Sequence, residues 1–165
     1  MVSNCGKLKS VQLQINTLHS LQILIIKGLP NLESFAKEGL PIKLRYLAVY
    51  RLGGSFLTTI IREWGLQRLT CLSTLYIEGD VLNVLMKMKM PLLPTSLVQL
   101  YIDNLCDIKS LDGKWLQHLT SLKELVITDA QQLESLPEEG LPSSLSKFSI
   151  WRCPLLEASC VKRVA

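Results

Sequence analysis

Histidine and cysteine would carry acid–base, nucleophilic or metal chemistry in this chain of 165 residues. The two histidines, His19 and His118, each stand beside a leucine at the approach to a predicted strand, which indicates a polar surface position. The five cysteines include no CxxC pair, and no glycine-rich loop is followed by Lys-Ser or Lys-Thr. The sequence therefore predicts no catalytic residue, no metal site and no cofactor, and we expect a protein that is not an enzyme.

Tyrosine, tryptophan and arginine indicate a different chemistry, the recognition of another protein. These residues are enriched at binding hot spots, where the aromatic ones give a large contact area at low entropic cost. Two alternatives stay open, because β-propensity alone favours tyrosine on exposed strands, and mixed charge is ordinary on a solvated face. The candidate protein-binding residues are Arg45, Tyr46, Tyr50, Arg51, Tyr76, Glu78, Tyr101, Asp103, Lys147, Trp151 and Arg152.

Six short segments position these residues, and the segments follow the pattern LxxLxI, with Val49 in place of the isoleucine in the second and Phe148 in place of the second leucine in the last. They lie at 21–26, 44–49, 72–77, 97–102, 122–127 and 145–150, so their first leucines are 23, 28, 25, 25 and 23 residues apart. This pattern at a spacing of about 20 to 29 residues is typical of leucine-rich repeats. We predict one leucine-rich-repeat domain over 1–165, with a strand near each segment and a partial first repeat at 1–20.

The repeat predicts an α/β fold, a solenoid with a curved parallel sheet on its concave side and irregular loops and short helices on its convex side. Side chains alternate between the two faces of a strand. The first, fourth and sixth positions of LxxLxI therefore point inward, and the intervening positions face solvent. The 34 leucines, about 21% of the chain, supply the inward positions. The outcome is a curved binding surface without an enclosed cleft.

Two features modify the basic repeat. The segments leading into the strands alternate between LxxL and a proline-containing type with a period of about 50 residues. Two inserts have helical patterns, and a shorter turn is expected from Asp112. The first helix places Phe56, Ile60 and Trp64 on one side and stops at Gly65, and the second begins at Asp80 as N-cap, places Val81, Leu85 and Met88 on one side and ends at Pro91.

Turn and end positions give two further expectations. Cys5 and Cys153 share the repeat position after the strand and are expected to be buried turn residues. Other repeats carry other residues there, so we expect an irregular turn ladder at Leu29, Leu52, Asp80, Leu105 and Ala130. The chain begins inside a repeat, and an uncapped apolar end at Val2, Leu8 and Val11 is expected to cause association.

Charge and targeting signals limit the partners and the location. The net charge is +4 and the pI is about 8.8, but no run of Lys and Arg indicates a surface for nucleic acid. The N-terminus has no apolar core of signal-peptide length, and no segment approaches the roughly 18 apolar residues of a membrane span. We expect a cytoplasmic or nuclear protein that binds neither nucleic acid nor membrane.

The motifs also resemble a known family. LESLPEEGLPSSLSKFSIWRCPLLEASC (133–160), with LTSLKELVI, LPTSLVQLYI and NLESFAKEGLP, closely resembles the C-terminal leucine-rich repeats of plant intracellular coiled-coil nucleotide-binding leucine-rich-repeat (NLR) disease resistance proteins. The resemblance implies innate immunity: sensing of a pathogen effector or a guarded host protein, and autoinhibition through the receptor's own nucleotide-binding module. The alternative is a truncated leucine-rich-repeat adaptor or scaffold with no sensing role.

Overall fold

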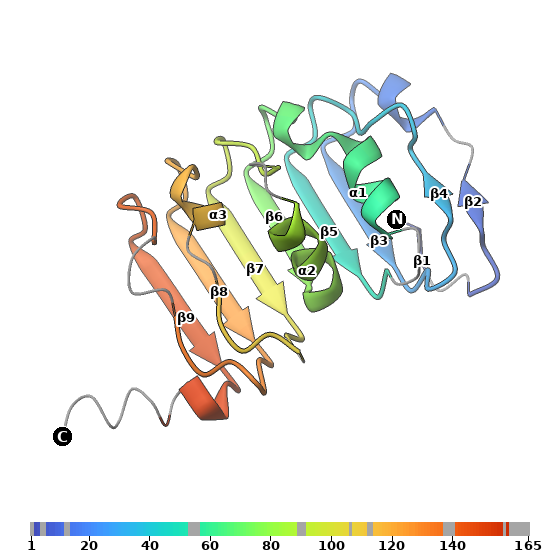
Figure 1. The fold of residues 1–165 in the computed structure, drawn as a ribbon. Coiled ribbons are helices and arrows are strands. Elements are labelled where there is room, and N and C mark those ends of the chain that lie inside the picture. Colours follow the sequence, from blue (N-terminus) through green and yellow to red (C-terminus); the bar gives the residue numbers. More distant parts are fainter. Residues whose placement is uncertain are drawn as a thin grey trace.

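A parallel sheet forms one side of the molecule, and short helices and loops lie against its other side (Figure 1). The computed structural model describes residues 2–3, 6–11, 14–52, 57–88, 92–105, 107–111, 114–136, 141–156 and 158. The sheet contains, in order, β1 (Val2–Ser3), β3 (Ile23–Lys27), β5 (Tyr46–Tyr50), β6 (Thr74–Glu78), β7 (Gln99–Asp103), β8 (Glu124–Thr128) and β9 (Lys147–Trp151). A second, two-stranded sheet pairs β2 (Ser10–Val11) with β4 (Ser34–Phe35).

The six strands of the LxxLxI segments each begin two residues later and end one residue later than predicted. The reason lies in the leucine that opens each segment, because its backbone N–H closes a turn with the residue three positions earlier. Leu44 donates to the Pro41 carbonyl at 3.0 Å, for example, and Leu72 to the Leu69 carbonyl at 3.0 Å. The same turn recurs before every one of these strands. The partial first repeat adds β1, a strand that the sequence did not predict.

The two predicted kinds of lead-in are visible in the structure, and both reach this common turn. The LxxL type follows a short helical segment: η1 (Ile15–Thr17), η2 (Leu66–Arg68) or α3 (Lys114–Gln117). Among the described residues, no helix directly adjoins the proline type, and in the two such lead-ins that contain Ser96 and Ser144 the serine makes additional bonds. Ser96 Oγ donates to the Leu69 and Leu72 carbonyls at 3.2 and 2.8 Å, which ties neighbouring lead-ins together.

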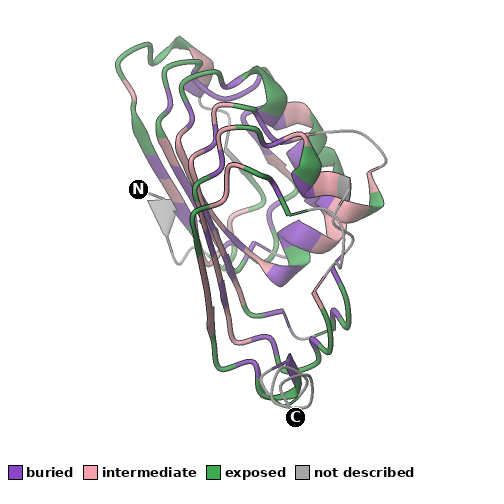
Figure 2. Ribbon diagram, turned by 90° about the vertical axis from the view of Figure 1, so that its left-hand side faces the viewer, coloured by how far each residue is buried: buried purple, intermediate pink, exposed green. Residues whose placement is uncertain are grey.

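The core is a ladder of aliphatic side chains between the sheet and the opposite layer (Figure 2). Its fourth-position leucines, from Leu47 on β5 to Leu125 on β8, are completely buried. Burying one such side chain contributes about 1.5–3 kcal/mol. In the last repeat, Leu145, Phe148 and Ile150 are only half-buried, because β9 pairs with β8 alone among the described strands. Leu8 is half-buried against the opposite end of this core.

The first insert forms helix α1 (Leu57–Trp64), whose apolar side packs on the core. The side chains of Ile60 and Trp64, predicted to share one side of the helix, are both buried, and Gly65 ends the helix as predicted, in a left-handed conformation with φ 58°. The Trp64 indole N–H donates to the Phe35 carbonyl at 3.0 Å, and the two rings meet edge to face at 6.1 Å. Phe56 lies outside the described residues.

The second insert forms helix α2 (Gly79–Lys87), which begins directly after β6. The prediction of Asp80 as N-cap was therefore wrong by two residues, since Glu78 takes that position and Asp80 lies in the first turn. Its carboxylate still stands near the positive end of the helix dipole. Val81 and Leu85 are buried, and Met88 is half-buried. Pro91 and Asp112, which were expected to end α2 and to begin α3, lie outside the described residues.

A left-handed residue follows most strands and turns the chain away from the sheet. Gly28, Arg51, Asn104, Asp129 and Arg152 occupy this position, with φ between 48° and 67°. At β6 the position belongs to Gly79, where α2 starts instead.

The next residue along the chain completes a buried turn ladder. Cys153 is fully buried, as expected, and Cys5 lies outside the described residues. The expected irregularity is wrong for Leu29, Leu52, Leu105 and Ala130, which are all buried, because any apolar side chain of suitable size fills this site. Asp80 is the exception and is exposed on α2.

Candidate protein-binding surface

The outward face of the sheet carries three rows of side chains, because alternate residues of each strand point away from the core. The start row contains Ile23, Tyr46, Thr74, Gln99, Glu124 and Lys147. The middle row contains Ile25, Ala48, Tyr76, Tyr101, Val126 and Ser149. The end row contains Lys27, Tyr50, Glu78, Asp103, Thr128 and Trp151. Ala48 is buried despite its outward position, because its small side chain lies between the larger Ile25 and Tyr76.

Three tyrosines from three successive strands form a stack on this face. The rings of Tyr50 and Tyr76 are 4.5 Å apart at an interplanar angle of 35°, and those of Tyr76 and Tyr101 are 6.1 Å apart at 13°. The Lys27 ammonium nitrogen lies 5.8 Å from the centroid of the Tyr50 ring. Burial, followed by the neighbouring Tyr46, raises the pKa of Tyr50 to about 12. We call Tyr50, Tyr76 and Tyr101 the tyrosine stack; Tyr46 lies beside it on the start row.

Asp103 holds the centre of the stack in place. The Tyr76 hydroxyl donates to Asp103 Oδ2 at 2.9 Å, and the Thr128 hydroxyl donates to Asp103 Oδ1 at 2.5 Å. The Asn104 backbone N–H also donates to Oδ1, at 3.0 Å. Burial and the bond to this carboxylate raise the pKa of Tyr76. The Tyr76 ring is therefore oriented before any partner arrives.

Glu124 plays the same part for Tyr101. Its carboxylate accepts hydrogen bonds from Lys147 Nζ at 2.6 Å, from Gln99 Nε2 at 2.9 Å and from the Tyr101 hydroxyl at 3.2 Å. The bonds from Lys147 and Gln99 lower the pKa of Glu124, and the same carboxylate raises the pKa of Lys147. Thr74 extends the network by donating to Gln99 Oε1 at 3.0 Å.

The structure brings only some of the predicted residues together. Tyr50, Tyr76, Tyr101, Glu78 and Asp103 form one contiguous strip. Lys147 joins it through its ion pair with Glu124. Glu124, Gln99 and Thr128 were missing from the predicted site, although their alternate strand positions put them on the same face.

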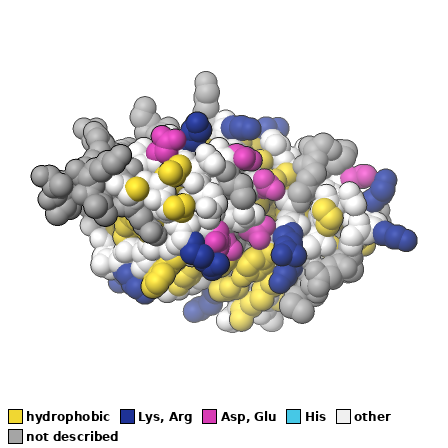
Figure 3. Space-filling model, turned by 90° about the horizontal axis from the view of Figure 1, so that it is seen from below, with side chains coloured by type: hydrophobic (Ala, Val, Ile, Leu, Met, Phe, Trp, Pro, Cys, Tyr) yellow, Lys and Arg dark blue, Asp and Glu magenta, His cyan; other side chains and the backbone are white. Residues whose placement is uncertain are grey.

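The remaining predicted residues lie around this strip. Trp151 on the last strand is 63% exposed. Arg51 contacts the strip through its backbone N–H, which donates to Glu78 Oε2 at 2.7 Å. Arg152 pairs with Asp129 at 3.3 Å, and Arg45 is exposed just before β5. Figure 3, which views the molecule from below, shows hydrophobic side chains beside both acidic and basic ones.

The described histidine and cysteine side chains either bond to backbone carbonyl groups or are exposed. His118 Nε2 is 2.9 Å from the Leu93 carbonyl, and His19 is exposed. The buried Cys153 thiol donates to the Trp151 carbonyl at 3.3 Å, and Cys71 is exposed. Within the described residues, no group of three or more His, Cys, Asp and Glu side chains is arranged to hold a metal ion, and no helix is long and apolar enough to cross a membrane.

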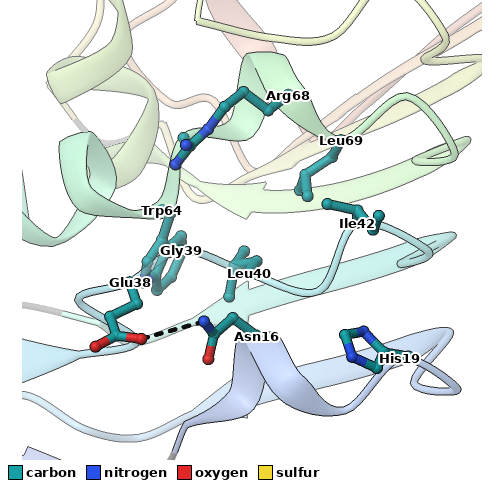
Figure 4. Close-up of a pocket in the computed structure, with 10 residues that line it drawn as sticks. Asn16, His19, Glu38, Gly39, Leu40, Ile42, Trp64, Arg68 and Leu69 are labelled. Atoms are coloured by element: carbon teal, nitrogen blue, oxygen red, sulfur yellow. Dashed lines mark hydrogen bonds between the residues drawn. The ribbon is translucent and has the colours of Figure 1, made fainter.

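A pocket of about 260 Å³ lies away from the outward face, between η1, the loop after β4 and η2 (Figure 4). Ile42 and Leu69 give it an apolar wall, and Glu38 and Arg68 bring opposite charges to it. Asn16 Nδ2 donates to Glu38 Oε2 at 3.2 Å, whereas Asn16 Oδ1 is buried without a hydrogen-bond partner among the described residues. None of the predicted binding residues lines this pocket, so it is separate from the tyrosine stack.

Comparison with known proteins adds no family assignment: no protein-family model, curated protein or solved structure matches the chain.

Proposed function

We propose that this chain is a leucine-rich-repeat recognition domain like that of plant intracellular immune receptors, and that it binds a protein through the outward face of its sheet. The partner is a pathogen effector, a host protein or the receptor's own nucleotide-binding module. The domain acts in the cytoplasm or the nucleus. The observation that carries this proposal is the tyrosine stack, in which three neighbouring strands present aromatic side chains on one surface.

The order of the strands supports the repeat architecture. Each LxxLxI segment contributes one strand, and neighbours in sequence are neighbours in the sheet from β3 through β5 to β9. Every one of these strands is preceded by the same turn and contributes the same inward positions to the core. Solenoids have this organisation, in which each repeat contacts its neighbours and an extended surface is left for binding.

The hydrogen bonds around the stack support recognition over a purely structural role. Tyr76 and Tyr101 are held at their hydroxyls by Asp103 and Glu124, respectively. A side chain that is already ordered loses less conformational entropy when a partner binds, so more of the contact energy appears as affinity. Core stability does not require these bonds, because the tyrosines point away from the core.

Replacement of the two central rings tests the proposal. The double variant Tyr76→Ala/Tyr101→Ala is expected to fold, because both residues lie outside the core, and to lose partner capture from plant extract. A control, Ile42→Ala, removes a side chain that is 62% exposed and lies in the separate pocket. Circular dichroism verifies folding in both variants. Equal capture by the double variant and the unmodified domain would rule out the outward face as the binding surface.

A scaffold with no sensing role is the alternative function. The two differ in genomic context, because a sensor of this type belongs to a longer receptor. A nucleotide-binding segment upstream in the source transcript supports the sensor, and a transcript that encodes the repeats alone supports the scaffold.

A further inference from the structure

The outward face has a negative centre, although the chain as a whole carries a net charge of +4. Glu78 and Asp103 are register partners on β6 and β7, in the middle of the sheet. We call these two residues the acidic pair. Neither forms an ion pair with a described residue. Within the described part of the chain, neither carboxylate is therefore held by a basic side chain in an ion pair.

The other carboxylates of this region are different, because each has a basic neighbour. Glu124 is paired with Lys147 at 2.6 Å, and Asp129 is paired with Arg152 at 3.3 Å. These pairs lie towards the last strands. Among these four carboxylates, those of the acidic pair, next to the tyrosine stack, are the two without an ion-pair partner in the described residues.

The acidic pair retains capacity to accept hydrogen bonds. A carboxylate offers about four acceptor sites. Glu78 uses one for the Arg51 backbone N–H, and Asp103 uses three for Tyr76, Thr128 and Asn104. Glu78 is half-buried at the end of β6, so the remaining sites of its carboxylate are open to a donor from solvent.

The tyrosine stack adds a second feature that favours a cation. Lys27 already lies over the outer ring, with its ammonium 5.8 Å from the Tyr50 centroid, which is within the range of a cation–π contact. Tyr101 ends the stack at the other side, where its row neighbour on β8 is Val126. Because valine presents no ring, the aromatic stack does not continue onto β8.

We infer that the outward face recognises an arginine or lysine side chain of its protein partner, with the cationic group against Glu78 and Asp103 and the adjoining chain over the tyrosine rings. This inference rests on the proposed function and specifies the chemistry of the partner. The inference is based on charge complementarity. The two carboxylates lie outside any described ion pair and beside aromatic rings. They therefore attract a cationic segment and repel the phosphates of nucleic acid.

Peptides of defined charge provide the test. The probe is a fluorescein-labelled peptide of alternating arginine and alanine, and the same peptide with glutamate in place of arginine is the anionic control. Fluorescence anisotropy measures the dissociation constant for the complete 165-residue chain at low and at physiological salt. We expect the arginine peptide to bind, with weaker binding at higher salt, and the glutamate peptide not to bind.

Two double variants with the same change in net charge locate the site. Glu78→Gln/Asp103→Asn preserves side-chain size and is expected to raise the dissociation constant at least about tenfold, a typical loss for a buried charge contact. Asp107→Asn/Glu134→Gln neutralises two exposed acids away from the outward face and is expected to change it less than about twofold. If the double variant unfolds, the single variant Glu78→Gln replaces it in the test, because it disturbs one hydrogen bond to a backbone N–H and no described ion pair. We expect this single variant to raise the dissociation constant by a factor between those of the two double variants.

Three results would overturn the inference: no binding of the arginine peptide, unchanged binding by the acidic-pair variant, or equal losses in both double variants. The proposed function fails separately, when Tyr76→Ala/Tyr101→Ala leaves partner capture unchanged. If the tyrosine variant loses capture while the acidic-pair variant retains it, the outward face binds a protein but the partner contact is not cationic.

Discussion

Replacement of Gly79 by alanine provides a sharp test of the packing between β6, α2 and β7. A Cβ atom added at Gly79 would lie 2.5 Å from the backbone carbonyl oxygen of Asn104 and 3.3 Å from its carbonyl carbon. Ordinary contacts of a Cβ atom begin near 3.4 Å, so the start of α2 and the turn after β7 must separate by about 1 Å. Both groups are backbone, and neither can yield by a change of rotamer.

The magnitude follows from two opposing effects. Forcing an extra carbon into a packed site costs about 1–3 kcal/mol. Alanine regains at most about 1 kcal/mol through its better helix propensity, and less at the first helical position. We therefore expect Gly79→Ala to lower the free energy of unfolding by about 1–2 kcal/mol, with a fall in Tm of about 2–8 °C for a chain of this size.

Urea unfolding followed by circular dichroism measures this change. Gly6→Ala is the matched control, because a Cβ at Gly6 would have nothing within 4 Å. We expect the control to change stability by less than about 0.5 kcal/mol. If Gly79→Ala were as stable as the unmodified chain, or more stable, the close approach of Asn104 to the start of α2 would be refuted.

Two further predictions concern the core and the tyrosine stack. Leu125→Ala removes a fully buried side chain and is expected to lower the free energy of unfolding by about 2–5 kcal/mol. Leu145→Ala, in the half-buried last repeat, is expected to lower it clearly less. Equal losses for the two variants in urea unfolding would contradict weaker packing at the last strand. The folded-state pKa of Tyr50 is raised to about 12 from an ordinary 10.0. The folded chain therefore holds the phenol proton more tightly than the unfolded chain does, and this difference stabilises the fold fully below pH 10 and is lost as the pH rises towards 12. We expect Tyr50→Phe to reduce the fall in the urea midpoint between pH 9 and pH 12, and an unchanged fall would show that Tyr50 ionises as freely in the folded chain as in the unfolded one.

The sequence was most informative where one repeat dictates both spacing and burial. Regular leucines at 23 to 28 residues place the strands, and alternation within each strand separates Leu100 inside from Tyr101 outside. These features depend on the strand period alone, so they could be read before any contact was known. Periodicity also predicts α1, whose apolar side chains recur with helical spacing and whose last residue precedes Gly65.

Features that depend on contacts between repeats could not be read in this way. The partners of the tyrosine hydroxyls, Asp103 and Glu124, lie on the neighbouring strand, 27 and 23 residues further along the chain. The start of α2 was misplaced because Asp80 is a good N-cap residue, whereas the helix begins at Gly79, where the close approach of the Asn104 backbone leaves no room for a Cβ atom. Strand alternation places Ala48 on the solvent-facing side, but it takes no account of the larger neighbouring side chains, Ile25 and Tyr76, that bury this residue.

Photo-cross-linking tests most directly the claim that the outward face binds a protein. A photoreactive phenylalanine analogue replaces Tyr101 in the stack or, in the comparison chain, the exposed Ile42 at the separate pocket. Each chain is then irradiated in plant extract. We predict a partner that is cross-linked from position 101 and absent from position 42. Cross-links that form from position 42 and not from position 101 would contradict binding through the outward face.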